Sequence, residues 1–122
     1  MRLLVVDDSK TIRSILCTYA KKLGCTTAEA ADGCEALERL DDSGPFDAAL
    51  VDWDMPRMNG FELLKIVRSV PEHDGMKIMM VTAQSSIDRV AEALGAGADD
   101  YLMKPLDEEM FVDKLRLLGL VI

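Results

Sequence analysis

Three aspartates follow runs of apolar residues in a pattern that could bring their carboxylates together. Asp7 and Asp8 come directly after the apolar residues 3–6, and Asp52 comes directly after residues 48–51. Thr82 follows a third apolar run at residues 78–81, and Lys104 follows a shorter one at residues 101–103. Carboxylates, a hydroxyl and an ammonium group that met at one place would form a site for a divalent cation and a phosphoryl group.

The apolar runs are the strands of the predicted fold. Runs of four or five apolar residues between polar ones are typical of strands buried on both faces of a sheet. Residues 26–30 form a weaker run of the same kind. Between the runs, apolar residues recur at helical spacing, which predicts helices around residues 12–23, 33–40, 61–68, 87–94 and 111–118.

This strict alternation of five strands and five helices predicts an α/β fold. The expected architecture is a flavodoxin-like (βα)5 doubly wound parallel five-stranded sheet with strand order 2-1-3-4-5. In such a sheet the ligand lies beyond the carboxyl ends of the strands, where the strand order reverses. Asp7, Asp8 and Asp52 should therefore converge between the first and third strands, with Thr82 and Lys104 at the same edge.

Converging carboxylates need a cation, because like charges repel one another. Oxygen ligands in a partly exposed site favour Mg²⁺, which Mn²⁺ could replace. A polar residue after a strand can instead cap the next helix, and Asp8 or Ser9 could have that role. Capping accounts for one aspartate of the three and not for their convergence, so the sequence predicts a magnesium site.

Composition narrows the class of protein. The chain has 122 residues, of which 49% are hydrophobic and 30% charged, as expected of one globular domain over residues 1–122 without an output domain. No apolar run approaches the roughly 20 residues that span a bilayer, so we expect a cytoplasmic protein without membrane insertion. The formal net charge of −8 argues against direct binding to nucleic acid.

The three cysteines are not placed for chemistry. Cys17, Cys25 and Cys34 are odd in number, and none of them is paired at a spacing typical of zinc ligands. We expect buried or half-buried free thiols.

Along essentially its whole length the sequence resembles the response-regulator receiver family. The matching segments are residues 3–9 (Leu-Leu-Val-Val-Asp-Asp-Ser), 51–60 (Val-Asp-Trp-Asp-Met-Pro-Arg-Met-Asn-Gly), 81–83 (Val-Thr-Ala) and 104–105 (Lys-Pro). Their order and spacing are those of the family, and the central segment is similar to that of the CheY-like chemotaxis regulators. Within it, Met55-Pro56 and Asn59-Gly60 indicate a shaped loop, because proline fixes φ and Asn or Gly tolerates positive φ.

The resemblance implies roles for the acidic residues. Asp52 would accept a phosphoryl group from the phosphohistidine of a sensor histidine kinase or a histidine phosphotransfer protein. Asp8, Asp52 and the backbone carbonyl of Asp54 would bind Mg²⁺, and Asp7 would act through water. The Asp54 side chain would also tune the lifetime of the phosphoryl group.

The resemblance also assigns the other site residues. Lys104 would pair with the phosphoryl group, and the peptide bond between Lys104 and Pro105 would be cis. Thr82 would move to contact the phosphoryl group, and Tyr101 would turn inward as the switch aromatic when Thr82 moves. Gln84, two residues after Thr82, would be a second residue that tunes phosphoryl lifetime.

Together these roles describe a phosphorylation-activated receiver domain that switches between two states. It would hydrolyse its own aspartyl phosphate slowly but turn over no other substrate, so we do not expect an enzyme. Its output would be protein–protein contact through the face formed by the fourth helix, fifth strand and fifth helix. A chemotaxis target, onward transfer in a phosphorelay and a receiver cropped from a larger regulator stay open. So do the cognate kinase and the choice between a monomer and a phosphorylation-dependent dimer.

Three other classes of protein share part of this pattern. Residues 52–54 also fit the Asp-x-Asp motif of haloacid-dehalogenase-type phosphatases, although those enzymes carry it on their first strand. Repeated hydrolysis of small phosphomonoesters would identify such a phosphatase. A phosphorylation-independent binding module would not need the intact set of acidic residues, Thr82 and Lys104. A Rossmann-type nucleotide binder would need a glycine-rich loop after the first strand, which the sequence lacks.

Overall fold

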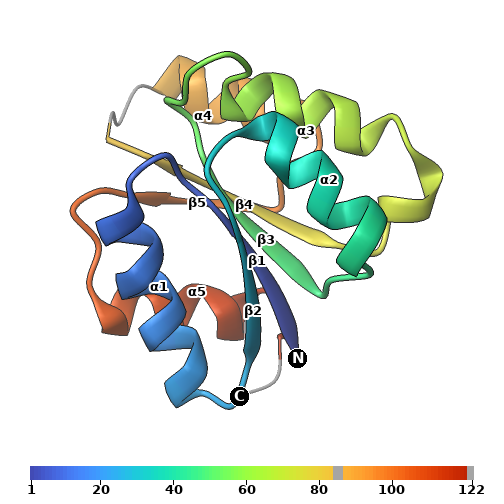
Figure 1. Cartoon of the computed structure of the whole chain (residues 1–122). Coiled ribbons are helices and arrows are strands. Elements are labelled where there is room, and N and C mark those ends of the chain that lie inside the picture. Colours follow the sequence, from blue (N-terminus) through green and yellow to red (C-terminus); the bar gives the residue numbers. More distant parts are fainter. Residues whose placement is uncertain (84–86, 121–122) are drawn as a thin grey trace.

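A five-stranded parallel sheet lies between two layers of helices in the computed structural model, which describes residues 1–83 and 87–120 (Figure 1). The strands pair in the order β2-β1-β3-β4-β5, as predicted. Their bounds are β1 Arg2–Val6, β2 Thr26–Ala30, β3 Ala48–Asp52, β4 Lys77–Thr82 and β5 Asp100–Met103.

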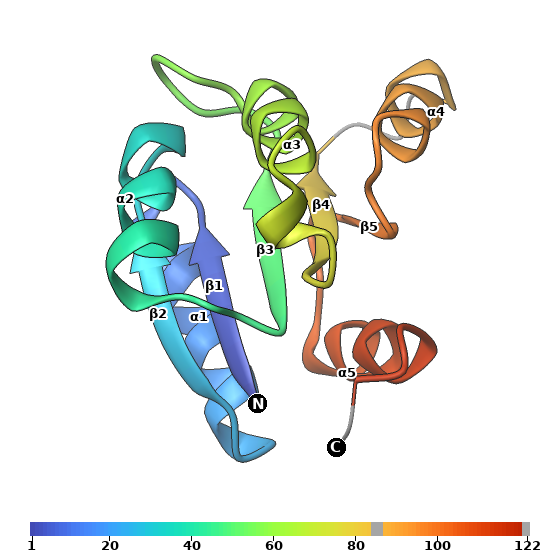
Figure 2. The same ribbon diagram turned by 90° about the vertical axis from the view of Figure 1, so that its right-hand side faces the viewer.

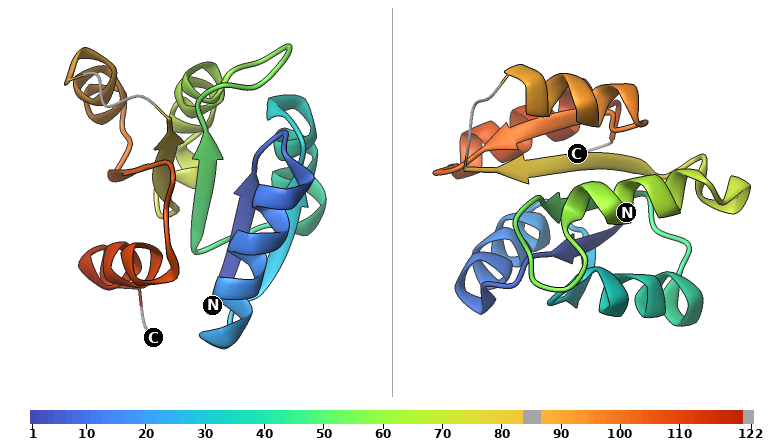
Figure 3. Two further views of the ribbon diagram at one scale, coloured as in Figure 1. Left: turned by 90° about the vertical axis from the view of Figure 1, so that its left-hand side faces the viewer. Right: turned by 90° about the horizontal axis from the view of Figure 1, so that it is seen from above.

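The helices divide between the two faces of the sheet. Helices α1 and α5 cover one face, and α2, α3 and α4 cover the other (Figures 2 and 3). A short 3₁₀ helix, η1 (Pro71–His73), was not predicted; it begins at a proline, whose missing N–H is tolerated in a first helical turn. The bounds of the α-helices are α1 Lys10–Lys22, α2 Gly33–Ser43, α3 Gly60–Arg68, α4 Ile87–Gly95 and α5 Glu108–Leu117.

Each face of the sheet has its own hydrophobic core, because side chains alternate along a strand. In β1, Leu3 and Val5 pack toward α1 and α5, whereas Leu4 and Val6 pack toward α2 and α3. All four side chains are almost completely buried. This double burial explains why residues 3–6 form an uninterrupted apolar run.

The strand register brings the predicted site residues to one edge of the sheet. Val6 of β1 is in register with Val51 of β3, so the aspartates that follow each of them lie at the same level. Asp52 is in register with Val81, and Thr82 with Met103. Thr82 is the last residue of β4, and Lys104 comes directly after β5.

Helix α4 has little buried surface. Ala93 is its one buried residue within the described range, whereas Ile87 and Leu94 are 84% and 45% exposed. The other four helices each bury two or more side chains. The position of α4 therefore depends more than theirs on polar contacts.

Two of the three cysteines are buried, and one lies at the surface. Cys17 and Cys25 are buried free thiols as expected, but Cys34 is exposed. Helix α2 buries Gly33, Ala36 and Leu40 at helical spacing, and this leaves Cys34 on the solvent side. No helix within residues 1–83 and 87–120 is long and apolar enough to span a bilayer.

Candidate functional site

Three carboxylates converge where β1 and β3 end, as the strand order required. Asp7, Asp8 and Asp52 each offer one carboxylate oxygen, and these oxygens lie within 4.8 Å of one another. Asp7 and Asp52 are only 1% and 3% exposed, whereas Asp8 is exposed. The cluster therefore has a protein side and a solvent side, which suits a cation that keeps part of its water shell.

Lys104 reaches into this cluster from the end of β5. Its Nζ lies 3.2 Å from Oδ2 of Asp7 and 3.3 Å from Oδ1 of Asp52. The peptide bond between Lys104 and Pro105 is cis. One ammonium group cannot neutralise three carboxylates, and the buried Oδ2 of Asp7 has only this ion pair with Lys104 among the described residues. The excess negative charge and the sparse contacts of this buried oxygen both fit a divalent cation.

The cluster shifts the pKa values of its members. Burial, reinforced by the charge of Asp7, raises the pKa of Asp52 to about 6, and Lys104 opposes this rise. Burial alone would lower the pKa of Lys104, but the charges of Asp52 and Asp7 outweigh it and raise that pKa. At neutral pH the site therefore holds an ionised Asp52 beside an ammonium group.

The segment after β1 leaves the Asp8 carboxylate available. Ser9 caps α1, and its Oγ accepts a hydrogen bond from the backbone N–H of Ile12 at 3.3 Å. The backbone N–H of Ser9 donates to Oδ1 of Asp7 at 2.8 Å, and Arg13 donates to the Asp7 carbonyl oxygen at 2.6 Å. Of the two candidate caps, Ser9 has that role, and Asp8 remains free of it.

The loop between β3 and α3 is tied back to the end of β3. The N–H of Gly60 donates to the carbonyl oxygen of Trp53 at 2.9 Å, and a β-carbon at Gly60 would overlap the Asp52 carbonyl oxygen. Positive φ occurs in this loop at Arg57 (67°), whereas Asn59 and Gly60, whose residue types tolerate positive φ, do not adopt it. Asn59 has an extended backbone instead, because its side chain caps α3 in a capping box with Glu62.

Sequence reasoning missed one residue at this site, Arg89 of α4. Its guanidinium bridges both carboxylate oxygens of Asp54, at 3.1 and 3.4 Å, and lies 4.5 Å from the centre of the Trp53 ring. Its Nη1 is also 3.4 Å from Oγ1 of Thr82. Nothing in the sequence distinguishes Arg89 from a solvent-facing helical arginine, because its partners become neighbours only in the folded sheet.

Two predicted site residues are left to place, Tyr101 and Gln84. Tyr101 is half-buried, and the ammonium of Lys114 lies 5.0 Å from its ring centre. Lys114 also pairs with Asp100 at 2.9 Å, so α5 is tied to β5 next to the predicted switch residue. Gln84 lies outside the described residues.

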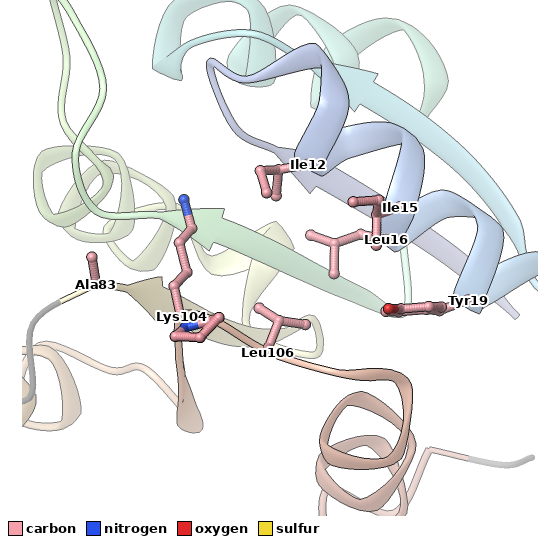
Figure 4. Close-up of a pocket in the computed structure, with 8 residues that line it drawn as sticks. Ile12, Ile15, Leu16, Tyr19, Ala83, Lys104 and Leu106 are labelled. Atoms are coloured by element: carbon pink, nitrogen blue, oxygen red, sulfur yellow. The ribbon is translucent and has the colours of Figure 1, made fainter.

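An apolar groove of about 460 Å³ adjoins the acidic cluster (Figure 4). Ile12, Ile15 and Tyr19 of α1 line one side, and Leu106 with the stem of Lys104 lines the other. Lys104 thus belongs to two environments: its ammonium contacts carboxylates, and its aliphatic chain faces the groove.

Comparisons with known proteins agree with this geometry. The sequence matches the response regulator receiver domain over residues 3–116. It is 40% identical over 116 residues to the chemotaxis protein CheY of Pseudomonas aeruginosa, covering 94% of this chain and 93% of that protein. It is 39% identical over 118 residues to CheY1 of Helicobacter pylori, covering 96% of this chain and 95% of that protein.

Solved structures give the same result. The structure of the chemotaxis response regulator CheY4 of Vibrio cholerae matches with a TM-score of 0.90 at 33% identity, covering 96% of this chain and 97% of that one. The strand order, the acidic cluster and the sequence matches over most of the chain agree. The chain belongs to the response regulator receiver domains of two-component signal transduction.

Proposed function

We propose that Asp52 is the phosphoacceptor of a phosphorylation-controlled switch. The observation that carries this proposal is the contact of Lys104 with Asp52 inside a cluster of three carboxylates. Asp52 is buried yet largely ionised at neutral pH, because its pKa is about 6. A carboxylate that keeps its charge in a site able to neutralise phosphoryl oxygens is suited to attack phosphorus.

The donor set fits a divalent cation. In our proposal Asp8, Asp52 and the backbone carbonyl of Asp54 hold Mg²⁺, or Mn²⁺ in its place, and Asp7 acts through water. The bound cation supplies charge neutralisation for the oxygens of the transferring phosphoryl group. Lys104 pairs with a phosphoryl oxygen, and the hydroxyl of Thr82 donates a hydrogen bond to another.

The transfer itself needs positioning more than acid–base chemistry. A carboxylate oxygen of Asp52 attacks the phosphorus of a phosphohistidine on a histidine kinase or histidine phosphotransfer protein. The P–N bond breaks, its electron pair stays on the imidazole nitrogen, and that ring takes up a proton from solvent. In slow self-hydrolysis, water attacks the phosphorus, the bond to Asp52 breaks, and inorganic phosphate leaves.

The output surface in this proposal is the face of α4, β5 and α5. Large apolar side chains are exposed along it: Ile87 and Leu94 on α4, Met103 on β5 and Met110 on α5. Exposed apolar side chains on these elements suit a protein partner better than a nucleic acid, which the net charge of −8 would repel. Because the relatives at 39–40% identity are named as chemotaxis proteins, we propose a CheY-like role in chemotaxis.

Beryllofluoride, a phosphoryl mimic, tests the site directly. Trp53 is the chain's single tryptophan and follows Asp52, so its fluorescence reports on the site. We expect a saturable change that needs Mg²⁺, is lost in Asp52→Asn and survives in Asp42→Asn on the exposed side of α2. A small-molecule phosphodonor should likewise add one phosphoryl group to the wild type and none to Asp52→Asn. Phosphorylation that survives the loss of the Asp52 carboxylate would overturn the proposal.

A further inference from the structure

Among the described residues, Arg89 connects α4 to the phosphorylation site through three contacts. The first is the bidentate ion pair with Asp54, and the second is the position of the guanidinium over the Trp53 ring. The third is the approach of Nη1 to Oγ1 of Thr82 at 3.4 Å. Its side chain is only 22% exposed. A guanidinium that stacks on an aromatic ring and pairs bidentately with a carboxylate has a fixed orientation, unlike the side chain of a solvated arginine.

The Trp53 ring beneath Arg89 is itself packed against a second aromatic ring. Trp53 is 7% exposed, and its ring stacks on Phe61 of α3 with ring centres 5.1 Å apart and planes 6° from parallel. The ammonium of Lys65 lies 4.7 Å from the centre of the Phe61 ring on α3. Arg89, Trp53, Phe61 and Lys65 thus form a linked series of cation–ring and ring–ring contacts from α4 to α3. A displacement of the Arg89 guanidinium would therefore break its contact with the Trp53 ring.

Helix α4 depends on this attachment. Ala93 is its one buried residue in the described range, so few apolar contacts oppose a shift of the helix. The Asp54–Arg89 pair joins it to the loop that begins at the phosphoacceptor.

We propose that Arg89 is a positioning residue that holds Thr82 and α4 in the unphosphorylated arrangement. This inference rests on Asp52 being the phosphoacceptor. The contact between Arg89 and Thr82 is at the limit of hydrogen-bond distance, so a shift of the hydroxyl toward Asp52 breaks it. Phosphorylation therefore works against this contact of Arg89, and its loss frees α4 to change position.

A double substitution tests this latch without changing the local charge. Asp54→Asn/Arg89→Gln removes one negative and one positive charge together and keeps the backbone carbonyl of residue 54. The matched control is Asp42→Asn/Arg39→Gln, which breaks a 3.1 Å ion pair within α2. With saturating Mg²⁺, the beryllofluoride concentration at half-saturation is read from Trp53 fluorescence. We expect it to fall about three- to tenfold in the latch variant and to stay at the wild-type value in the control.

A second measurement separates the latch from a merely structural role. In metal-free protein, amide hydrogen exchange in α4 should be faster in the latch variant, while α1 and α5 keep their wild-type rates. Arg89→Lys keeps the charge but loses the bidentate geometry, so its half-saturation should lie between those of the wild type and the latch variant.

Half-saturation that is unchanged or higher in the latch variant, beside a normal wild type and control, would overturn the latch alone. A wild type that does not respond to beryllofluoride would instead overturn the phosphoacceptor proposal, and this inference with it.

Discussion

Asp52 is a buried carboxylate beside a like charge, so its ionisation works against folding. Its pKa in the folded protein is about 6, above the ordinary value of 3.8. The folded state therefore binds this proton more tightly than the unfolded state, and stability falls as pH rises from about 4 to about 6. The same charge that makes Asp52 a candidate nucleophile destabilises the metal-free domain.

Asp52→Asn should accordingly stabilise the metal-free protein. We expect the free energy of unfolding in urea at pH 7.5 to rise by about 1–3 kcal/mol, with the gain vanishing below about pH 4. Mg²⁺ should stabilise the wild type more than the variant, because the variant lacks one carboxylate ligand. Asp42→Asn, an exposed change on α2, is the control and should give no such gain. A variant no more stable than the wild type at pH 7.5 would contradict the electrostatic account of the site.

At this scale the sequence predicted the residues whose position follows from topology. Asp7, Asp8, Asp52 and Lys104 lie where the carboxyl ends of their strands must meet. Arg89 was missed because its contacts depend on how α4 packs, which no spacing in the sequence reveals. The shaped loop around Asn59 and Gly60 was predicted, but its positive φ at Arg57 was not, because no residue type there indicates it.

Among the elements, the β3–α3 loop depends on one close approach. A β-carbon at Gly60 would overlap the carbonyl oxygen of Asp52, which is backbone and cannot easily move aside. Gly60→Ala should therefore lower the free energy of unfolding by about 1–3 kcal/mol. It should also weaken Mg²⁺ binding, because the loop that carries the Asp54 carbonyl must shift. Urea denaturation and Mg²⁺ titration by Trp53 fluorescence measure the two effects.

Gly75→Ala is the matched control for this change. A β-carbon at Gly75 would meet nothing within 4 Å. We expect its stability and Mg²⁺ affinity to stay near those of the wild type. If Gly60→Ala changed stability and Mg²⁺ affinity no more than Gly75→Ala does, the loop would accommodate a β-carbon at residue 60 without strain, and the prediction would be wrong.

The regular elements were predictable because their burial is regular. Each apolar run became a strand, and each set of apolar residues at helical spacing became a helix, with bounds that moved by a few residues. The 3₁₀ helix at Pro71–His73 was missed because three residues are too few to show a period. The two-sided core, which follows from alternating side chains, was implied by the uninterrupted apolar runs.

For the whole molecule, the net charge of −8 should oppose the approach of anionic phosphodonors. At about 10 mM salt the screening length is about 30 Å, so a donor feels most of the chain; at about 150 mM it is about 8 Å. We therefore expect the phosphorylation rate with acetyl phosphate at saturating Mg²⁺ to rise with KCl over this range. Phosphoramidate, which carries less charge, should show a smaller rise.

Distant charges can be separated from those of the site by a variant in α2. Asp41→Asn/Asp42→Asn removes two exposed carboxylates that contact neither the acidic cluster nor Lys104. Its rate should exceed that of the wild type at low salt and match it at high salt, because screening removes only the long-range contribution. If the rate with acetyl phosphate fell as salt increased, the positive field of Lys104 and the bound cation would outweigh the charge of the whole chain. The rate of phosphorylation would then depend on the charges next to Asp52 and not on the net charge of the chain.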